Sequence, residues 1–299
     1  MARTDDDLRA VMDVRRAVDE DARPTLENLR HARQSMHAEY ILARDGGAAV
    51  GYGMSAVFPG MSDEPFLWSD AGVVPDRRSN GIGEQLLRRV SERGRDLGKQ
   101  GLQLEVKEDD QHSIRFVERR GFQEVEREHE VALDLTALAE PPPIDPPPGV
   151  RIVPYTEQPD LEHEMYRVDR EASNDIPGLA ATLDQTFEEW RIFAIERPSR
   201  DLELTFLAVA DGRVVGVAYL ETYGDRCIHN LTGVVREWRG RGVASAMKRA
   251  QIAGAHARGV KRLVTESQHE NLPMRKLNEK LGYRPTVANI VYRGALLEV

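Results

Sequence analysis

Cysteine, long apolar stretches and aromatic residues are all scarce in this sequence of 299 residues. The single cysteine, Cys227, has no partner for an internal disulfide, which argues against a disulfide-stapled secreted fold. No apolar run approaches the roughly 18 residues that a membrane span needs. Residues 1–7 include three consecutive aspartates and resemble no secretory signal. We therefore expect a globular cytoplasmic protein with no membrane partner.

Positive charge is also in deficit, because 41 lysines and arginines face 50 aspartates and glutamates. Nucleic-acid-binding proteins usually carry a basic surface, so the net charge of −9 argues against nucleic acid as the main partner. Residues 1–140 hold 20 basic and 28 acidic residues, a net charge of −8, and residues 141–299 hold 21 and 22, a net charge of −1. A polyanionic small molecule would therefore bind more easily to the second half.

Proline is concentrated in one place, since six of the 16 prolines lie between residues 141 and 148. Proline fixes φ and removes a backbone donor, so neither a helix nor a central strand can run through this segment. We predict an extended linker over residues 139–149, between an N-terminal domain (1–138) and a C-terminal domain (150–299). The alternative is a proline-rich surface loop inside one domain.

The sequence on the two sides of this segment repeats. Residues 73–83 match residues 234–244 with a constant shift of 161, and Gly121-Phe122 matches Gly282-Tyr283 with the same shift. Upstream, residues 49–52 match residues 214–217 with a shift of 165. Two copies of one domain explain this self-similarity, and its period is too long for a solenoid repeat.

Both copies have the same predicted order of elements. A helical region is followed by a hairpin with an Asp-Gly turn, a strand, a glycine-containing loop that opens a helix, another strand, a short helix and a closing strand. The order predicts an α/β (α+β) fold, in which helices flank a mixed, mainly antiparallel twisted sheet in each copy. The predicted helical regions are 5–20 and 158–172, and the strands around the glycine loops are 66–74, 102–106, 228–235 and 262–267.

The glycine loop of the second copy, residues 239–244, lies between a predicted strand and a predicted helix. The first N–H groups of a helix lack partners and its dipole adds positive potential, so such a junction suits a phosphate or pyrophosphate. An ordinary helix cap is the alternative. Neither the P-loop pattern nor the dinucleotide-binding Gly-x-Gly-x-x-Gly pattern is present.

Each half resembles a domain of the GCN5-related N-acetyltransferase (GNAT) family, in which an Arg/Gln-x-x-Gly-x-Gly/Ala loop holds the pyrophosphate of coenzyme A. The resemblance covers nearly the whole chain. The arrangement of the two halves is similar to that of tandem, two-domain family members. It implies acetyl-CoA as co-substrate and no metal. The resemblance assigns Asn271 to the cofactor arm, and a helix N-cap is an equally good explanation of this residue. The cofactor-binding residues that the resemblance implies are Val234 and Val235 for the acetyl and pantetheine arm, Arg239, Gly240, Arg241, Gly242, Ala244 and Ser245 for the pyrophosphate, and Asn271 for the cofactor arm.

The resemblance also implies acetyl transfer to an amine by direct attack in a ternary complex. Many family members place a tyrosine where Asn278 stands, to protonate the leaving thiolate. Asparagine has no transferable proton at neutral pH, so either the thiolate takes its proton from water or Asn278 only hydrogen bonds the sulfur. Glu221 is the first candidate for the base, with Glu266 and His229 as alternatives. Asp175 would either grip a cationic acceptor or cap a loop.

The N-terminal copy looks degenerate. Asp110 and Val117 stand where the second copy has Asn271 and Asn278, and a first strand like that of residues 151–154 is not apparent. We expect a scaffold copy beside an active C-terminal copy.

The leading hypothesis is therefore an acetyl-CoA-dependent N-acetyltransferase acting on a primary amine of a small molecule. The alternative is a non-catalytic acyl-CoA-binding or interaction protein. The acceptor, the acyl chain preference and the oligomeric state stay open.

Overall fold

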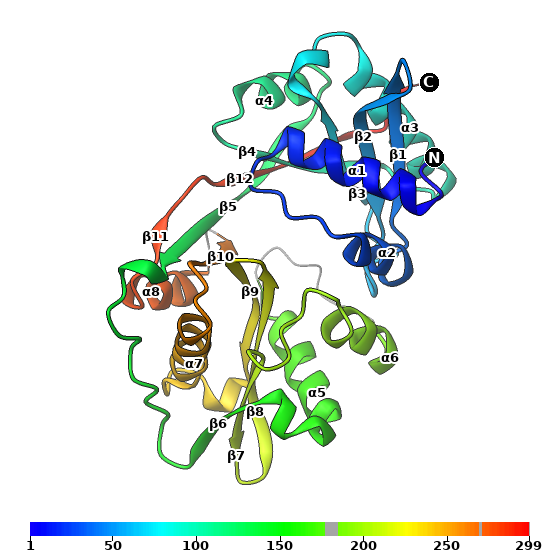
Figure 1. Cartoon of the computed structure of the whole chain (residues 1–299). Coiled ribbons are helices and arrows are strands. Elements are labelled where there is room, and N and C mark those ends of the chain that lie inside the picture. Colours follow the sequence, from blue (N-terminus) through cyan, green and yellow to red (C-terminus); the bar gives the residue numbers. More distant parts are fainter. Residues whose placement is uncertain (177–184, 269–270, 299) are drawn as a thin grey trace. The chain divides into compact units, whose positions relative to one another are not determined.

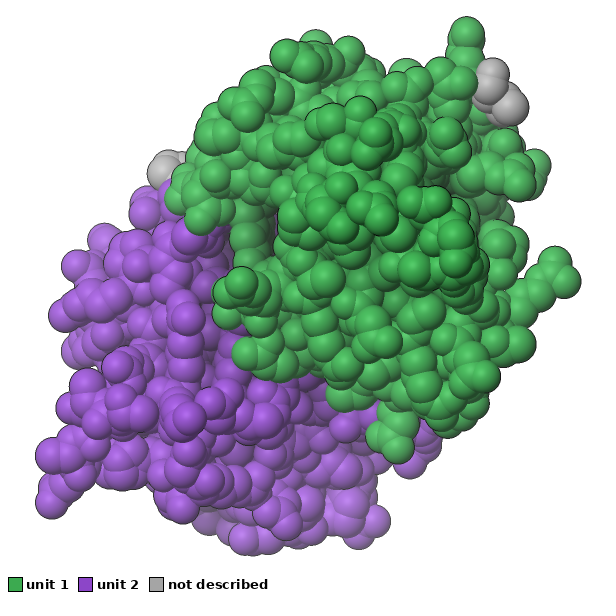
Figure 2. Space-filling model, turned by 45° about the horizontal axis from the view of Figure 1, so that its top comes forward, with its two compact units in different colours: residues 1–127, 289–299 green, residues 128–288 purple. Residues whose placement is uncertain are grey.

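The computed structural model describes residues 1–176, 185–268 and 271–298, and the chain forms two compact units (Figure 1). Unit 1 consists of Met1–Arg127 together with Asn289–Val299, and unit 2 of Glu128–Ala288 (Figure 2). These limits differ from the predicted domains 1–138 and 150–299, because the closing strand of the second copy lies in unit 1 and most of the closing strand of the first copy lies in unit 2. The proline-rich residues 141–148 belong to unit 2 and form neither helix nor strand.

In unit 1 the strands follow the order β1-β2-β3-β4-β12. Neighbouring strands are antiparallel except for the parallel pair β3–β4. The closing strand of this sheet, β12, comes from the end of the chain. The elements are α1 (Asp5–Val18), α2 (Leu26–Ser35), β1 (Glu39–Asp45), β2 (Ala48–Ala56), β3 (Phe66–Val73), α3 (Ile82–Asp96), β4 (Gly101–Lys107), α4 (Gln111–Glu118) and β12 (Asn289–Ala295).

In unit 2 the order is β6-β7-β8-β9-β10-β5, where β5 (Gln123–Asp134) enters from the first half of the chain. Only β9–β10 is parallel. The remaining elements are β6 (Val150–Pro154), α5 (Glu162–Ser173), α6 (Phe187–Trp190), a π-helix (Arg191–Ile195), β7 (Phe206–Ala210), β8 (Arg213–Tyr223), β9 (Arg226–Val234), α7 (Val243–Ala257), β10 (Arg262–Gln268), α8 (Leu272–Lys280) and β11 (Arg284–Pro285).

The hairpins form where Asp-Gly interrupts two apolar runs. Asp211 and Gly212, between β7 and β8, have φ angles of 50° and 75°. Gly46 and Gly47, between β1 and β2, have φ angles of 55° and 89°. Two-residue hairpin turns favour such positive φ values, so the turn residues set the strand connections. The mixed, mainly antiparallel sheet with flanking helices confirms the predicted fold class.

Helices cover both faces of the sheet in unit 2, with α7 on one face and α5 on the other (Figure 1). A Cβ on Gly216 of β8 would meet Met247 of α7, and a Cβ on Gly233 of β9 would meet Ala172 of α5. Gly216 pairs with Val234, one position along from Gly233. Successive strand residues point to opposite faces, which explains why these glycines meet different helices.

The outer edges of the two sheets differ. In unit 2, β6 pairs with β7 from Val150 to Pro154, which agrees with the predicted first strand. Among the described residues of unit 1, no strand precedes α1, and a single backbone bond joins the Ala2 N–H to the Tyr40 carbonyl at 2.8 Å. Ala2 therefore covers part of the edge that a first strand covers in unit 2.

Candidate functional site

The parallel strands β9 and β10 separate after a short contact. They pair over three positions, Arg226–Arg262, Cys227–Leu263 and Ile228–Val264, and no further pair joins them in the described part of the chain. β10 continues to Gln268 on its other side, against β5. The backbones of β9 and β10 therefore diverge beyond Ile228 and Val264. We call this divergence the β9–β10 opening, and its closed end lies next to Ile228.

A β-bulge lies in β9 beside this opening. Leu220 of β8 pairs with His229, but Ala218 pairs with Thr232, so β9 has one extra residue between these pairs. An extra residue bends a strand and withdraws backbone groups from the ladder. The equivalent pairing in unit 1, β2 with β3, runs without a shift from Gly51–Val73 to Ala56–Trp68. The bulge is thus a difference between the two copies.

The loop between β9 and α7 contains the predicted glycines. Gly240 and Gly242 have φ angles of 71° and 92°, which glycine adopts without strain. A Cβ at either position would meet nothing within 4 Å, so the space beside them is free. α7 starts after Gly242 with no side-chain cap, which leaves the N–H groups of Val243, Ala244 and Ser245 available to an anion.

The arginines of this loop have different partners. The Arg239 Nε donates to the Val234 carbonyl at 2.8 Å, and its Nη2 pairs with Asp175 at 2.7 Å. Arg236 forms a second ion pair with Asp175. Hydrogen bonds from Arg236 and Arg239 lower the pKa of Asp175 to about 2. The Arg241 guanidinium lies 5.0 Å from the centre of the Trp238 ring.

Three polar side chains, two on the strands that border the opening and one on helix α8, have buried atoms without a hydrogen-bond partner in the described structure. They are the Thr232 hydroxyl on β9, the Ser267 hydroxyl on β10, and both polar atoms of the Asn278 amide on α8. Asn278 is 1% exposed. A buried polar group without a partner costs about 1–3 kcal/mol, so these atoms have hydrogen-bonding capacity that a ligand or water could use. In unit 1 the positions shifted by 161 are apolar: Ala71, Val106 and Val117.

Asn271 caps α8, and its Oδ1 accepts from the Met274 N–H at 3.3 Å. This agrees with the helix-cap interpretation, while its contact with a cofactor stays a prediction. Val234 and Val235 are both buried, and the Val235 N–H already donates to the Val215 carbonyl at 3.0 Å. Their contacts with the cofactor arm also stay predictions.

Glu221 on β8 lies level with the closed end of the opening, one strand away from it, because it pairs with Ile228 of β9. Its side chain is buried and accepts hydrogen bonds from Arg197 at 2.6 Å, from Ser199 at 3.0 Å and from Tyr223. Burial alone would raise the pKa of Glu221, but the charges of Arg197 and Arg200 outweigh it and hold the pKa below its usual value. Glu221 is therefore a charged carboxylate at neutral pH.

His229 lies on the other face of the sheet, so the structure does not bring it together with Glu221. Gln251 donates from its Nε2 to two backbone carbonyls, so its Oε1 accepts from the His229 Nδ1–H at 2.9 Å. The His229 Nε2 then accepts from the Tyr283 hydroxyl at 2.5 Å. Burial, followed by the charge of Lys248, lowers the pKa of His229 well below its usual value, which keeps the ring neutral. Glu266 is exposed on β10.

Lys248 is a buried residue of the site for which the sequence analysis predicted no role. Its side chain is 1% exposed, and its ammonium lies 5.5 Å from the centre of the Tyr283 ring. No ion pair or hydrogen bond to it is found among the described residues. Burial lowers the pKa of Lys248 to about 7. The available signal was a lysine directly after the run 243–247, whose residues are small or apolar, at the position where unit 1 has Leu87.

The equivalent loop of unit 1 is less suited to an anion. Ser79 occupies the place of Gly240 and has a φ angle of 65°, which strains a residue with a side chain. Glu84 stands where unit 2 has Ser245, in the first turn of α3, and it forms ion pairs with Arg88 and Arg120. A carboxylate at this helix start competes with a phosphate.

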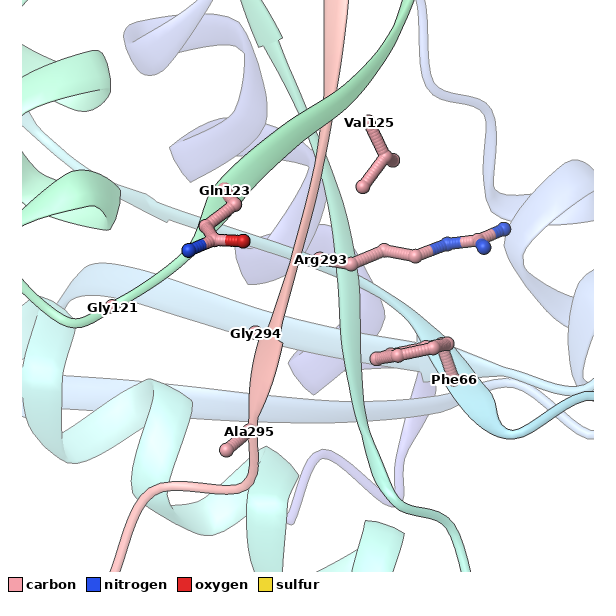
Figure 3. A pocket seen from close by; sticks show the side chains of 7 residues that line it. All are labelled: Phe66, Gly121, Gln123, Val125, Arg293, Gly294 and Ala295. Atoms are coloured by element: carbon pink, nitrogen blue, oxygen red, sulfur yellow. The ribbon is translucent and has the colours of Figure 1, made fainter.

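A shallow cleft of about 480 Å³ lies in unit 1 (Figure 3). Arg293, whose guanidinium lies 5.0 Å from the centre of the Phe66 ring, is its one charged lining residue. In the described residues no group of three or more His, Cys, Asp or Glu side chains is arranged to hold a metal ion. Over the same residues, no helix is long and apolar enough to cross a membrane.

Comparisons with known proteins agree with this geometry. The family model described as the acetyltransferase (GNAT) family matches twice, over residues 8–122 and 163–283. A mycothiol acetyltransferase from Nocardiopsis dassonvillei is 24% identical over 294 residues, which cover 90% of this chain and 85% of that protein.

Solved structures are similar over the whole chain. A tandem GNAT protein from the clavulanic acid biosynthesis pathway has a TM-score of 0.80 and 22% identity, covering 100% of this chain and 97% of the other. A GCN5-related N-acetyltransferase from Sphaerobacter thermophilus has a TM-score of 0.74 and 22% identity, covering 100% and 96%. The fold, the similarity to a tandem GNAT structure and the two family matches all point to the same family. The chain belongs to the acetyltransferase (GNAT) family and is an N-acetyltransferase of that type with two copies of the family domain.

Proposed function

We propose that the protein transfers the acetyl group of acetyl-CoA to a primary amine of a small molecule, by direct attack in a ternary complex in unit 2. The observation that carries the proposal is the set of unpartnered polar atoms around the β9–β10 opening, on Thr232, Ser267 and Asn278. The apolar residues at the equivalent positions of unit 1 support unit 2 as the active copy. The name of the mycothiol acetyltransferase relative supports a small acceptor.

The residues of unit 2 fit the phosphates of a coenzyme A thioester. The first N–H groups of α7 and the Arg239 and Arg241 guanidinium groups would hold the pyrophosphate, and Gly240 and Gly242 leave space for it. Bound acetyl-CoA supplies an activated acetyl group. The amide of Asn278 would donate a hydrogen bond to the sulfur, which steadies the leaving thiolate without transferring a proton.

Glu221 stays our first candidate for removing the amine proton. Its carboxylate is charged at neutral pH and lies beside the closed end of the opening. Because its pKa is low, it would act by orienting a water molecule that receives the proton. The neutral ring of His229 and the exposed carboxylate of Glu266 remain the alternatives.

The loops of the two units provide a matched test. Gly242 and Gly81 each precede a helix of 15 residues, with φ angles of 92° and 78° and free space where a Cβ would lie. Valine at either position strains the backbone to a similar extent. In calorimetric titration, we expect one acetyl-CoA per wild-type chain, at least a 100-fold loss of affinity in Gly242→Val, and little change in Gly81→Val.

Two wild-type sites, or a loss of affinity in Gly81→Val alone, would contradict the placement of the site in unit 2. Release of free thiol with a panel of primary amines tests turnover. Binding of acetyl-CoA without turnover of any amine would favour the non-catalytic acyl-CoA-binding protein.

A further inference from the structure

Asp175 holds two arginines at the start of the glycine loop. Its Oδ1 lies 2.5 Å from the Arg236 Nη2, and its Oδ2 lies 3.0 Å from the Arg236 Nε and 2.7 Å from the Arg239 Nη2. One carboxylate therefore receives a two-point contact from Arg236 and a third bond from Arg239. This is the geometry in which guanidinium groups also bind phosphate oxygens.

These bonds come from the end of α5, on the face of the sheet opposite α7. Asp175 follows the last residue of α5, Ser173, by two positions. Glu171, within the same helix, accepts the Arg236 backbone N–H at 2.7 Å. The start of the pyrophosphate loop is thus tied by two carboxylates to a helix that packs on the other face.

Arg241 is not part of this arrangement. Its guanidinium stacks on Trp238, and no carboxylate pairs with it among the residues that the structure describes. An incoming phosphate therefore finds Arg241 and the start of α7 open, while Arg236 and Arg239 are already occupied.

Unit 1 shows that the carboxylate is not needed to shape the loop. Arg78, the equivalent of Arg239, donates from its Nε to the Val73 carbonyl at 3.1 Å, as Arg239 does to Val234 at 2.8 Å. Within the described part of unit 1, Arg78 makes no ion pair. The loop conformation is thus kept without a partner for the outer guanidinium nitrogens.

We infer that Asp175 competes with the pyrophosphate of the cofactor for Arg239, which belongs to both arrangements, so that acetyl-CoA binding breaks the Asp175–Arg239 ion pair and loosens the end of α5. The inference rests on the proposed cofactor site. It makes Asp175 a residue that sets cofactor affinity, and it links the phosphate site on one side of the sheet to a helix on the other.

The test is the affinity of Asp175→Asn for acetyl-CoA and for S-acetylpantetheine, which lacks the pyrophosphate. Removing the competitor is expected to lower the Kd for acetyl-CoA by about two- to fivefold, the scale of an exposed ion pair. The Kd for S-acetylpantetheine is expected to stay unchanged. Asp175→Glu, which keeps the charge, is expected to bind acetyl-CoA like the wild type.

The matched control is Glu164→Gln, which removes an equal charge from the same helix, where Glu164 pairs with Arg167 at 3.0 Å. Its affinity for acetyl-CoA is expected to stay unchanged. The pKa of Asp175 is about 2, so titrations at pH 7.5 compare a charged with a neutral side chain. Melting temperatures of all variants confirm that they fold, and Asp175→Ser replaces Asp175→Asn if the latter does not.

The outcomes separate the two proposals. A wild-type protein that binds no acetyl-CoA overturns the proposed function and the inference with it. If the wild type binds, equal or weaker binding by Asp175→Asn overturns the inference alone and makes Asp175 a support for the arginines. A similar gain in the affinity of Asp175→Asn for S-acetylpantetheine also overturns the inference, because the effect would then not depend on the pyrophosphate. A similar gain in the affinity of Glu164→Gln for acetyl-CoA overturns it as well, because the effect would then not be specific to Asp175.

Discussion

At the residue scale, the two copies differ most at buried positions around the β9–β10 opening. The protein keeps one helix-on-sheet arrangement twice, but at several buried positions unit 2 has a polar side chain where unit 1 has an apolar one. Buried polar groups cost free energy unless they are paired or serve a ligand. Relative to unit 2, the apolar replacements in unit 1 are Leu87 for Lys248, Val90 for Gln251, Val106 for Ser267, Val117 for Asn278 and Phe122 for Tyr283.

Lys248 provides a prediction at this scale, because burial lowers its pKa from 10.5 to about 7. Between these two pH values the unfolded chain binds more protons than the folded chain, so this residue makes stability rise with pH. Lys248→Met removes the free-energy cost of burying a charged ammonium group. We expect the variant to exceed the wild type in free energy of unfolding by about 3–5 kcal/mol at pH 6, at about 1.4 kcal/mol per pKa unit.

The difference in free energy of unfolding between Lys248→Met and the wild type is expected to shrink steadily toward pH 10. Urea unfolding at pH 6, 8 and 10 measures it. The control is Lys261→Met, which changes an exposed lysine paired with Asp225. A difference between Lys248→Met and the wild type that does not depend on pH would show that Lys248 is not desolvated as the structure indicates.

At the element scale, the site depends on strand β9, which carries the bulge and is packed closely by helix α5. A Cβ on Gly233 would lie 2.5 Å from the Cβ of Ala172, a distance that real Cβ atoms do not reach. The neighbouring atom is a methyl group fixed to the helix backbone, so neither side can yield. Close contact between α5 and β9 therefore requires glycine at position 233.

Gly233→Ala is expected to reduce the free energy of unfolding by about 1–3 kcal/mol, as overpacking does. Adding Ala172→Gly removes the opposing methyl group and is expected to restore most of the loss. A double-mutant cycle in urea measures the coupling between the two positions. Losses that simply add in the double variant would mean that α5 does not pack on β9 in this way.

At the scale of the whole molecule, the two halves of the chain exchange their closing strands. β12, from the end of the chain, pairs with β4 from Asn289–Lys107 to Ala295–Gly101 in unit 1. β5, from the first half, pairs with β10 from Arg262–Asp134 to Gln268–Glu128 in unit 2. A cut at the proline-rich segment therefore divides both sheets, although sequence composition predicts a domain boundary there.

Two fragments of similar length test this arrangement. Residues 149–299 lack the partner of β10 and carry β12 without β4, so we expect exposed strand edges and aggregation. Residues 128–288 contain all of unit 2, and we expect a soluble fragment that binds acetyl-CoA. Size-exclusion chromatography and calorimetry compare them. A soluble, monomeric 149–299 fragment that binds acetyl-CoA would contradict a structural need for the exchange.

The sequence alone was enough to determine the repeated domain, the Asp-Gly hairpins, the glycine loops at the starts of α3 and α7, and the family. Each of these features depends on residues close together in the chain, through turn geometry, helix periodicity or a short motif. The resemblance to the family also drew attention to Asn278, which stands where many family members have a tyrosine, and its role stays a prediction.

Only the tertiary structure decided the strand exchange, the bulge in β9, the burial of Lys248 and the pairing of Asp175 with Arg236 and Arg239. The bulge is a shift in register between two strands, and the exchange joins strands more than a hundred residues apart. Neither feature therefore leaves a local pattern in the sequence. Whether a charged side chain is buried, or which arginine an aspartate meets, depends on packing between elements. The chemistry of the site can therefore be predicted only in part from the sequence.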